Sequence, residues 1–406
     1  MQLPLPHLYR WALILWFGLG TAIASATPGE PASHGVKPPA ADPNEFHFVV
    51  LGDAQFDNPA TFNRVIDQVR RLRPALVLQV GDLIEGYNSD LQVIRGEWQR
   101  FKRQIAPLAP IPFYGVPGNH DVYGSNKEPD AALEAAFEGE MGPLFYHFQY
   151  KNTLFVVLNS DTREAMGSIN ETQMNWLRRV LAASNADHKF AFMHQPPFLM
   201  DNAETLHNLF KAFGVGQVFY GHHHHYHHHQ RDGVSYTMTN AGGLMGQAEP
   251  LVGGYHHLLQ VSVRSDSVDV AVIAADSIAP QDSVRAEDNY DMFSLTRSLV
   301  SERTPMQRTG TGQYNMAVQL ANNSRRDIQI FVECDSPDKR WRLEPASIDL
   351  VVLQAGTKRE IPLTASYSAD RQPEGTPHCD VRVPMQTHFG RWTHFQGRTI
   401  GVIPGG

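Results

Sequence analysis

The sequence predicts an α/β domain followed by a smaller all-β domain, and three observations support this division. Between residues 46 and 273, short apolar runs alternate with longer runs of helical periodicity, a pattern typical of βα units around a buried central sheet. Beyond residue 309 there are only strand-like runs separated by turn signals, which indicates a β-sandwich. Hydrophobic residues make up 42% of the 406 residues and charged residues 19%, a composition that suits a globular core and excludes disorder and a multi-span membrane protein.

The helices and strands of the α/β domain follow from the spacing of its apolar residues. In the segment 59–72, Phe62, Val65, Ile66 and Val69 recur at helical spacing and would share one face. Further helices are expected at 90–108 and 171–183, and strands at 46–51, 75–80, 113–116, 154–158, 190–193 and 218–220. The pattern changes after residue 233, and consecutive antiparallel strands are expected at 236–239, 258–263 and 268–273.

The C-terminal region is expected to form a sandwich that is immunoglobulin-like in its strand pattern. The preceding segment, 277–303, is polar and weakly periodic, so we interpret it as a linker with a short helix near 292–300. Strands are expected at 314–320, 327–334, 347–352, 359–365 and 379–384. The small domain would therefore cover residues 304–406, and the α/β domain residues 44–276.

The chain has only two cysteines, Cys334 and Cys379, and both lie in strand-like runs of the C-terminal region. In an oxidising compartment, a single disulfide that staples this small domain is the favoured interpretation. The alternative is a pair of buried free thiols, which pack well as small hydrophobic groups.

The N-terminus has the pattern of a secretory signal peptide. An apolar run from Trp11 to Ile23 follows Arg10 and is too short to span a bilayer comfortably, and small residues then offer a cleavage point after Ala26. Residues 1–26 are therefore expected to be removed, and the Pro- and Ala-rich stretch 27–43 to be a flexible leader. An uncleaved anchor or a buried helix is the alternative. The expected location is periplasmic or secreted, with no transmembrane anchor after cleavage.

The formal net charge of −8 is spread along the sequence, with no long acidic or basic block. Nucleic-acid-binding proteins carry a clustered basic stripe, so no nucleic-acid partner is expected and a nuclease is disfavoured.

Metal-binding residue types follow several of the predicted strands at the point where each strand ends. They are Asp53 and Gln55, Asp82, Asn119-His120-Asp121, His194, and His222 with His224. In an open α/β sheet, loops at the carboxyl ends of strands converge, so these side chains are expected to lie together. Carboxylates and imidazoles suit zinc, iron and manganese, and no thiolate is in the set.

This ordered set resembles the calcineurin-like metallophosphoesterase family, whose pattern is D-x-H, G-D, G-N-H-D/E, H and G-H-x-H. The resemblance covers residues 46–273 and implies a four-layered α/β/β/α sandwich with two divalent or trivalent metal ions, of iron, manganese or zinc. By position, Asp82 would bridge the two ions. One ion would take Asp53, Gln55 and His224, and the other Asn119, His194 and His222.

The sequence departs from the family pattern at Gln55, where the family has histidine. An amide oxygen is a neutral and weaker donor than imidazole, so a harder metal or partial occupancy of the first site is implied. The purple branch of the family has a tyrosine three residues after the Gly-Asp aspartate. Here that position is Glu85, and Tyr87 comes two residues later, so the protein is not expected to be purple.

The resemblance implies hydrolysis of phosphate esters by attack of a metal-bound hydroxide. His120 would face the substrate as an electrophile or proton donor. Asp121 would either orient that imidazole or simply stabilise its turn. Tyr123 and Gln195 are interpreted as residues that pack or hydrogen-bond within the loops. A non-catalytic metal-binding or adhesion protein of the same fold is the alternative, and the presence of both Asp82 and His120 argues against it.

Five further histidines, His223, His225, His227, His228 and His229, lie next to the last motif and have no ligand position in the family pattern. The simpler interpretation is a solvated loop or strand in which they have no special role. The alternative is that they collect or load metal ions.

Overall fold

The structure of the protein is a computed structural model that describes residues 43–246, 249–274, 277–368 and 373–403. The predicted signal peptide and all but the last residue of the predicted leader lie outside these ranges. None of the helices within them combines the length and hydrophobicity required to cross a bilayer.

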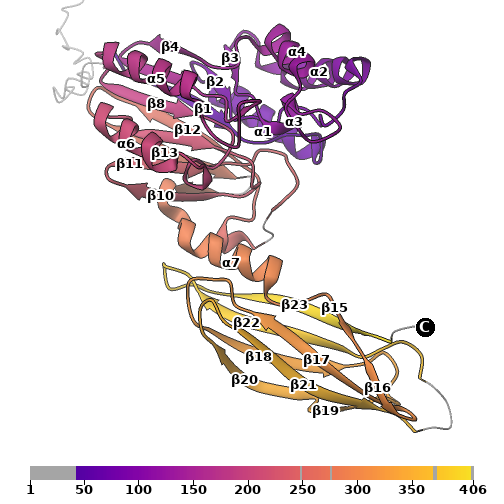
Figure 1. The fold of residues 1–406 in the computed structure, drawn as a ribbon. Coiled ribbons are helices and arrows are strands. Elements are labelled where there is room, and N and C mark those ends of the chain that lie inside the picture. The colour runs from indigo at the N-terminus through magenta and orange to yellow at the C-terminus, as the bar shows by residue number, and fades with distance from the viewer. Residues whose placement is uncertain (1–42, 247–248, 275–276, 369–372, 404–406) are drawn as a thin grey trace, which may run out of the picture. The chain divides into compact units, whose positions relative to one another are not determined.

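The first sheet of the α/β domain has six strands in the order β14-β13-β12-β1-β2-β3 (Figure 1). Its parallel half consists of β1 (Phe46–Leu51), β2 (Val77–Gln79) and β3 (Phe113–Gly115). The antiparallel half consists of β12 (His257–Val263), β13 (Val268–Ala274) and β14 (Ile278–Pro280). The strands predicted near 258–263 and 268–273 are thus antiparallel neighbours, as expected.

The second sheet also has six strands, in the order β10-β11-β9-β8-β5-β4. They are β4 (Tyr146–Tyr150), β5 (Thr153–Val157), β8 (His188–Phe192), β9 (Gln217–Tyr220), β10 (His227–Arg231) and β11 (Val234–Met238). The strand near 236–239 was predicted to be antiparallel to β12 and β13 in the same sheet, and this prediction is wrong. β11 pairs in parallel with β9, and its Tyr236 packs in the core beneath the helices of this second sheet.

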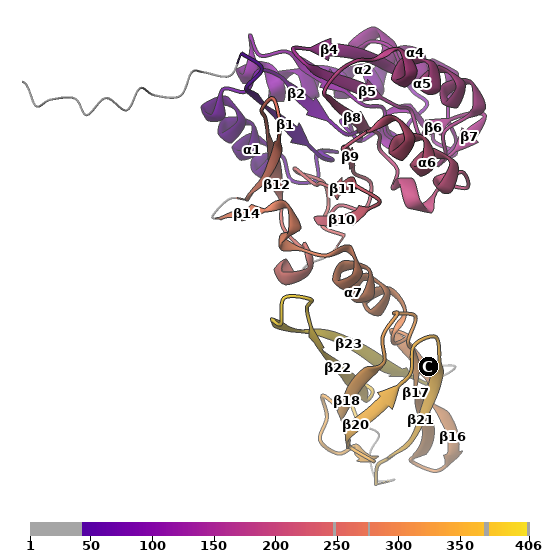
Figure 2. The same ribbon diagram turned by 90° about the vertical axis from the view of Figure 1, so that its left-hand side faces the viewer.

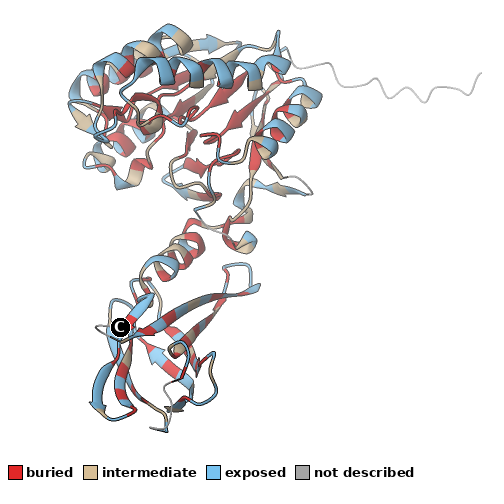
Figure 3. Ribbon diagram, turned by 90° about the vertical axis from the view of Figure 1, so that its right-hand side faces the viewer, coloured by how far each residue is buried: buried red, intermediate tan, exposed pale blue. Residues whose placement is uncertain are grey.

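The two sheets and two sets of helices form four layers. Between the sheets, Phe48 and Val50 of β1 pack with Phe155 and Phe192 of the opposite sheet. Val49 and Leu51 point the other way, because side chains alternate along a strand, and pack with helices α1 (Pro59–Leu72), α2 (Leu91–Ile105) and α4 (Ala131–Met141). The outer face of the second sheet is covered by α5 (Glu171–Ala183) and α6 (Ala203–Phe213). Both sheets are therefore buried on two faces (Figure 3), and the predicted α/β/β/α arrangement is confirmed.

The segment predicted as a linker contains more regular structure than its polarity suggested. Residues 278–280 form β14 at the edge of the first sheet, and helix α7 (Ala286–Ser298) begins six residues before the predicted helix. Periodicity is weak because α7 buries polar side chains on one side, among them Asp288, Asn289 and Asp291. Asp288 and Asp291 accept hydrogen bonds from the guanidinium of Arg326, which compensates their burial.

The C-terminal region is a two-sheet sandwich (Figure 2), as predicted. One sheet has the order β15-β23-β22-β18-β20 and the other β16-β17-β21-β19. The strands are β15 (Arg303–Pro305), β16 (Gln307–Gly310), β17 (Gln313–Ala321), β18 (Ile328–Asp335), β19 (Arg342–Glu344), β20 (Ser347–Leu353), β21 (Lys358–Ser366), β22 (His378–Gln386) and β23 (Trp392–Val402). Inward-facing residues of both sheets share one core with Met292, Leu295 and Leu299 of α7.

The predicted disulfide is confirmed. Cys334 of β18 and Cys379 of β22 are directly opposite each other in the sheet and are bonded, and both are buried in the sandwich core. The bond links residues 45 positions apart, so it restricts a long loop in the unfolded chain.

Replacing both cysteines by alanine is expected to lower the stability of the sandwich by about 4 kcal/mol, the loop-entropy value for a closure of this length. Denaturant unfolding of the full chain, followed by far-UV circular dichroism, measures the change. Reduced wild-type protein should match the variant. An unchanged unfolding midpoint in both samples would contradict the stabilising role.

Candidate metal centre

The loops that follow β1, β2, β3, β8 and β9 bring the predicted site residues together at one edge of the two sheets. Two glycines make this approach possible. A Cβ atom on Gly118 would lie 2.3 Å from Oδ1 of Asp82, and one on Gly221 would lie 2.4 Å from Oδ1 of Asp53. Any larger residue at these two positions would push the carboxylates away. The glycines that precede Asn119 and His222 therefore allow the loops to pack closely.

The first cluster contains Asp53, Asp82 and His224, whose ligand atoms lie within 4.8 Å of one another. Nε2 of His224 is 3.1 Å from Oδ2 of Asp53. Gln55 is also here, with its amide Nε2 donating to Oδ2 of Asp82 at 2.6 Å. All four residues predicted for the first ion, counting the bridging Asp82, are thus side by side.

The second cluster contains Asp82, His194 and His222. Nε2 of His194 is 3.2 Å from Oδ2 of Asp82, and Oδ1 of Asn119 is 2.9 Å from both Nε2 of His194 and Nδ1 of His222. Asp82 is the residue common to both clusters, which is the position that a bridging ligand requires.

The hydrogen bonds around the second cluster leave its ligand atoms facing one another. Nδ1 of His194 lies 2.9 Å from the carbonyl oxygen of Val80, so it carries a proton, and in the neutral ring Nε2 then has the lone pair. The amide nitrogen of Asn119 donates to the Tyr87 hydroxyl, which turns Oδ1 toward the two histidines. Lone pairs that converge in this way repel one another unless a proton or a metal ion lies between them, so the donor set can hold a metal ion in place of the proton.

The electrostatics of the site also call for positive charge. Asp53 and Asp82 are fully buried, and within the described residues their ion pairs are with histidines only. Burial opposes ionisation of Asp82, but the nearby imidazoles of His194 and His120 hold its pKa well below the usual range. Burial likewise opposes protonation of His194, but the carboxylates of Asp82 and Asp53 raise its pKa. Burial and the His194 charge lower the pKa of His222 to about 3, which keeps it neutral, the form that binds metals.

His120 lies beside the two clusters and is partly exposed. Its backbone N–H donates to Oδ1 of Asp82 at 2.9 Å, and its ring Nδ1 is 2.5 Å from the carbonyl oxygen of Glu85. The ring of Tyr87 packs edge-on against it at 4.3 Å between centroids. Because Nδ1 must donate to the Glu85 carbonyl, Nε2 is the nitrogen left for a substrate, and it donates a proton only from the imidazolium.

Asp121 stabilises the loops rather than the imidazole. Its fully buried carboxylate accepts hydrogen bonds from the backbone N–H groups of Gly118 and Leu83, both at 2.9 Å, and of Ile84 at 3.2 Å. Burial and the Asp82 charge raise the pKa of Asp121, and the amide donors oppose this. Of the two roles predicted for Asp121, the geometry favours the turn, and the carbonyl of Glu85 is what orients His120.

A hydrogen-bonded group behind Asn119 was not predicted as a unit. Asp161, which is fully buried, accepts from the Tyr123 hydroxyl at 3.0 Å and from Nε2 of Gln195 at 2.8 Å. Gln195 also lies 3.4 Å from Oδ1 of Asn119. Tyr123 and Gln195 thus bond within the loops, as interpreted. Asp161 follows β5 closely, so the strand-end rule that found the other residues would have found it as well.

Three of the five further histidines are buried and His223 and His229 are half-buried, which corrects the simpler sequence interpretation of a solvated segment. His225 and His227 are fully buried, and His228 is 7% exposed. The segment lies inside because β10 forms the edge of the second sheet and helix α7 packs beside it.

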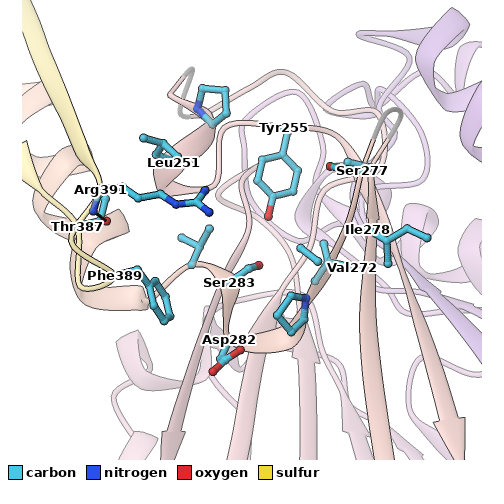
Figure 4. Close-up of a pocket in the computed structure, with 15 residues that line it drawn as sticks. Leu251, Tyr255, Val272, Ser277, Ile278, Asp282, Ser283, Thr387, Phe389 and Arg391 are labelled. Carbon is cyan, nitrogen blue, oxygen red and sulfur yellow. Dashed lines mark hydrogen bonds between the residues drawn. The ribbon is translucent and has the colours of Figure 1, made fainter.

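The structure also contains a pocket of about 860 Å³ (Figure 4). Its lining includes Leu251, Tyr255, Val272, Phe389 and Arg391, and none of the predicted ligands. The chemistry-bearing residues are therefore concentrated in the loops at the sheet edge and not in this cavity.

In a comparison with known proteins, residues 46–226 match the family model of calcineurin-like phosphoesterases. Human (Homo sapiens) tartrate-resistant acid phosphatase type 5 is 25% identical over 166 residues, which cover 34% of this chain and 51% of that protein, so the chain spans about half of that relative. A solved dimetal phosphatase from Danio rerio is 16% identical, with 59% of this chain and 99% of that chain covered and a TM-score of 0.46. A purple acid phosphatase from yellow lupin (Lupinus luteus) is 17% identical, with coverage of 59% and 53% and a TM-score of 0.46. The family match includes every predicted ligand, from Asp53 to His224.

Gln55→His is expected to tighten metal binding at the first cluster by roughly tenfold, or about 1.4 kcal/mol, because imidazole is a stronger donor than an amide. Competition with a chromophoric chelator measures the affinity. Gln92→His, an exposed position on α2, is the matched control and should change nothing. Weaker binding in Gln55→His would show that residue 55 is not a ligand.

Asp121→Asn is expected to reduce stability by about 1–3 kcal/mol, because an amide cannot accept from three N–H donors and places its own N–H₂ against them. Denaturant unfolding of the full chain gives the value. Unchanged stability together with lost turnover would instead assign Asp121 to the orientation of His120.

Proposed function

Because residues 46–226 form a calcineurin-like phosphoesterase domain, we propose that this protein is an exported hydrolase of phosphate esters that works with two bound metal ions. The observation that carries the proposal is the position of Asp82. Its buried carboxylate belongs to both ligand clusters, and each cluster is completed by nitrogen and oxygen donors from separate loops. A single structural ion would not require a shared carboxylate.

The proposed ligands are Asp53, Gln55, Asp82 and His224 for one ion, and Asp82, Asn119, His194 and His222 for the other. Two ions bound there would neutralise the charge of a phosphate ester and lower the pKa of water toward neutrality. Nitrogen and oxygen donors without thiolates favour iron, manganese or zinc.

His120 is the residue proposed to act on the substrate. The carbonyl of Glu85 and the ring of Tyr87 fix the imidazole, and its backbone N–H is tied to Asp82. With the ring held in this way, Nε2 of the imidazolium would stabilise the transition state by hydrogen bonding and would protonate the leaving oxygen. The preorganised ring needs little rearrangement when the ester binds.

Three observations support export and a phosphomonoester substrate. The sequence has a signal-peptide pattern, and the Cys334–Cys379 disulfide is of the kind that persists in oxidising compartments. The similar human protein is an acid phosphatase by name, so phosphomonoesters are the first substrate class to test. The Tyr87 hydroxyl bonds to Asn119 in the second cluster, which supports the expectation that the protein is not purple.

In metal-loaded protein, Asp82→Asn is expected to abolish hydrolysis of p-nitrophenyl phosphate, and His120→Ala to reduce kcat by about 10²–10⁴-fold. The first change removes the shared carboxylate, and the second removes the proton donor while the ligands remain. Asp67→Asn and His147→Ala, at exposed positions, are the matched controls. Parallel assays with bis(p-nitrophenyl) phosphate separate monoesterase from diesterase activity.

Metal analysis of the same samples makes the result specific. Asp82→Asn should lose bound metal, whereas His120→Ala should retain the wild-type content. If wild-type protein holds two ions and hydrolyses neither ester, the non-catalytic alternative replaces this proposal.

A further inference from the structure

A row of imidazole rings continues from the second metal cluster along the chain. The ring centroids of His222 and His223 are 5.2 Å apart, those of His223 and His225 are 5.9 Å apart, and those of His225 and His227 are 5.5 Å apart. The left-handed backbone of His222 and His224 bends the chain before β10, and the rings of His223, His225 and His227 nevertheless follow one another as neighbours. We refer to these three residues as the histidine row. The first ring of the row, that of His223, contacts His222, which belongs to the second cluster.

Helix α7 covers the row with an aromatic side chain in place of water. The ring of Phe293 stacks on His223 at 5.6 Å between centroids and contacts His225 at 5.7 Å. The Arg297 guanidinium lies on Phe293, 4.5 Å from the ring centroid. The imidazoles near the metal centre are therefore largely removed from solvent.

Two members of the row lack the hydrogen bonds that burial normally demands. Both ring nitrogens of His225, and Nδ1 of His223, are buried without a well-formed hydrogen bond among the described residues, and the His225 ring has only a weak interaction with the His223 backbone. Leaving such a group unpaired costs about 1–3 kcal/mol. By contrast, both nitrogens of His227 are paired, with the Tyr220 hydroxyl at 2.8 Å and Oδ1 of Asn289 at 3.1 Å. Packing alone would favour an apolar residue at 223 and 225.

We propose that His223 and His225 form a third metal site, for a transition-metal ion of the zinc class, next to the dinuclear centre. Imidazole is a ligand that zinc, copper and nickel accept readily, and a bound ion would satisfy the lone pairs that the protein leaves unpaired. The site lies outside the ligand set of the dinuclear centre, and its occupancy does not depend on hydrolysis.

The charges around the row make this site weaker than the dinuclear centre. Its two imidazoles are neutral ligands, whereas the dinuclear centre has the buried carboxylates of Asp53 and Asp82. Arg297 adds a positive charge nearby. An ion held by His223 and His225 is therefore favoured to move on toward His222, so the third site would load the centre. This loading role rests on the proposed function, but the binding itself does not.

Zinc titration of the chelator-treated full chain, read by competition with a chromophoric chelator, tests the site. Wild-type protein is expected to bind three ions, the last about tenfold or more weaker than the first two, and His225→Phe is expected to bind two. Phenylalanine keeps the aromatic packing against Phe293. His228→Phe is the matched control, since both nitrogens of His228 are also buried without a partner but the residue is outside the row; it should bind three ions.

Two ions in wild-type protein, or three in His225→Phe, would overturn the proposal, as would loss of the third ion in His228→Phe. If His225→Phe does not fold, electron paramagnetic resonance of Cu²⁺ added to zinc-loaded wild-type protein decides instead. Coupling to imidazole nitrogen supports the site, and its absence overturns it. Because no readout is enzymatic, a third site would stand even if neither phosphoester were hydrolysed.

Discussion

The structure depends on keeping two carboxylates, Asp53 and Asp82, buried beside imidazoles, and among the described residues their ion pairs are with histidines and not with lysine or arginine. A buried carboxylate is costly unless positive charge compensates it. The fold meets this demand by directing loops from both sheets to one edge, so that donors from distant parts of the sequence surround each carboxylate. The two sheets, each buried on both faces, provide the rigid base from which these loops extend.

Backbone groups hold this arrangement in place. The Val80 carbonyl fixes the tautomer of His194, and the Glu85 carbonyl fixes the ring of His120. Asp121 ties the loop after β3 to the loop after β2 through three amide groups. The ligand geometry is thus built from contacts that are independent of any ion, which is how a protein preorganises a metal site.

Much of the fold and site followed from local sequence patterns. The helices at 59–72 and 171–183 have the predicted bounds, because one-sided apolar spacing continues to their ends; Pro59 begins the first, and the Asn170 side chain caps the second. All seven predicted ligands lie together, because each follows a strand end. The sheet to which β11 belongs could not be predicted, since pairing depends on contacts between distant segments. The burial of His225 and His227 was missed for a similar reason: the cover comes from α7, which lies some sixty residues later.

The two ligand clusters are chemically unequal, and Gln55 is the reason. Its amide nitrogen donates to Oδ2 of Asp82, the same oxygen that lies 3.2 Å from His194. In this orientation the amide nitrogen of Gln55 competes with a cation for the shared carboxylate. The amide group would have to make a half-turn before its oxygen could bind the ion. In the second cluster the corresponding amide contact is longer, with Nε2 of Gln195 3.4 Å from Oδ1 of Asn119, and two imidazoles converge on that oxygen. An ion should therefore occupy the second cluster before the first, and that cluster is also the one that the histidine row touches.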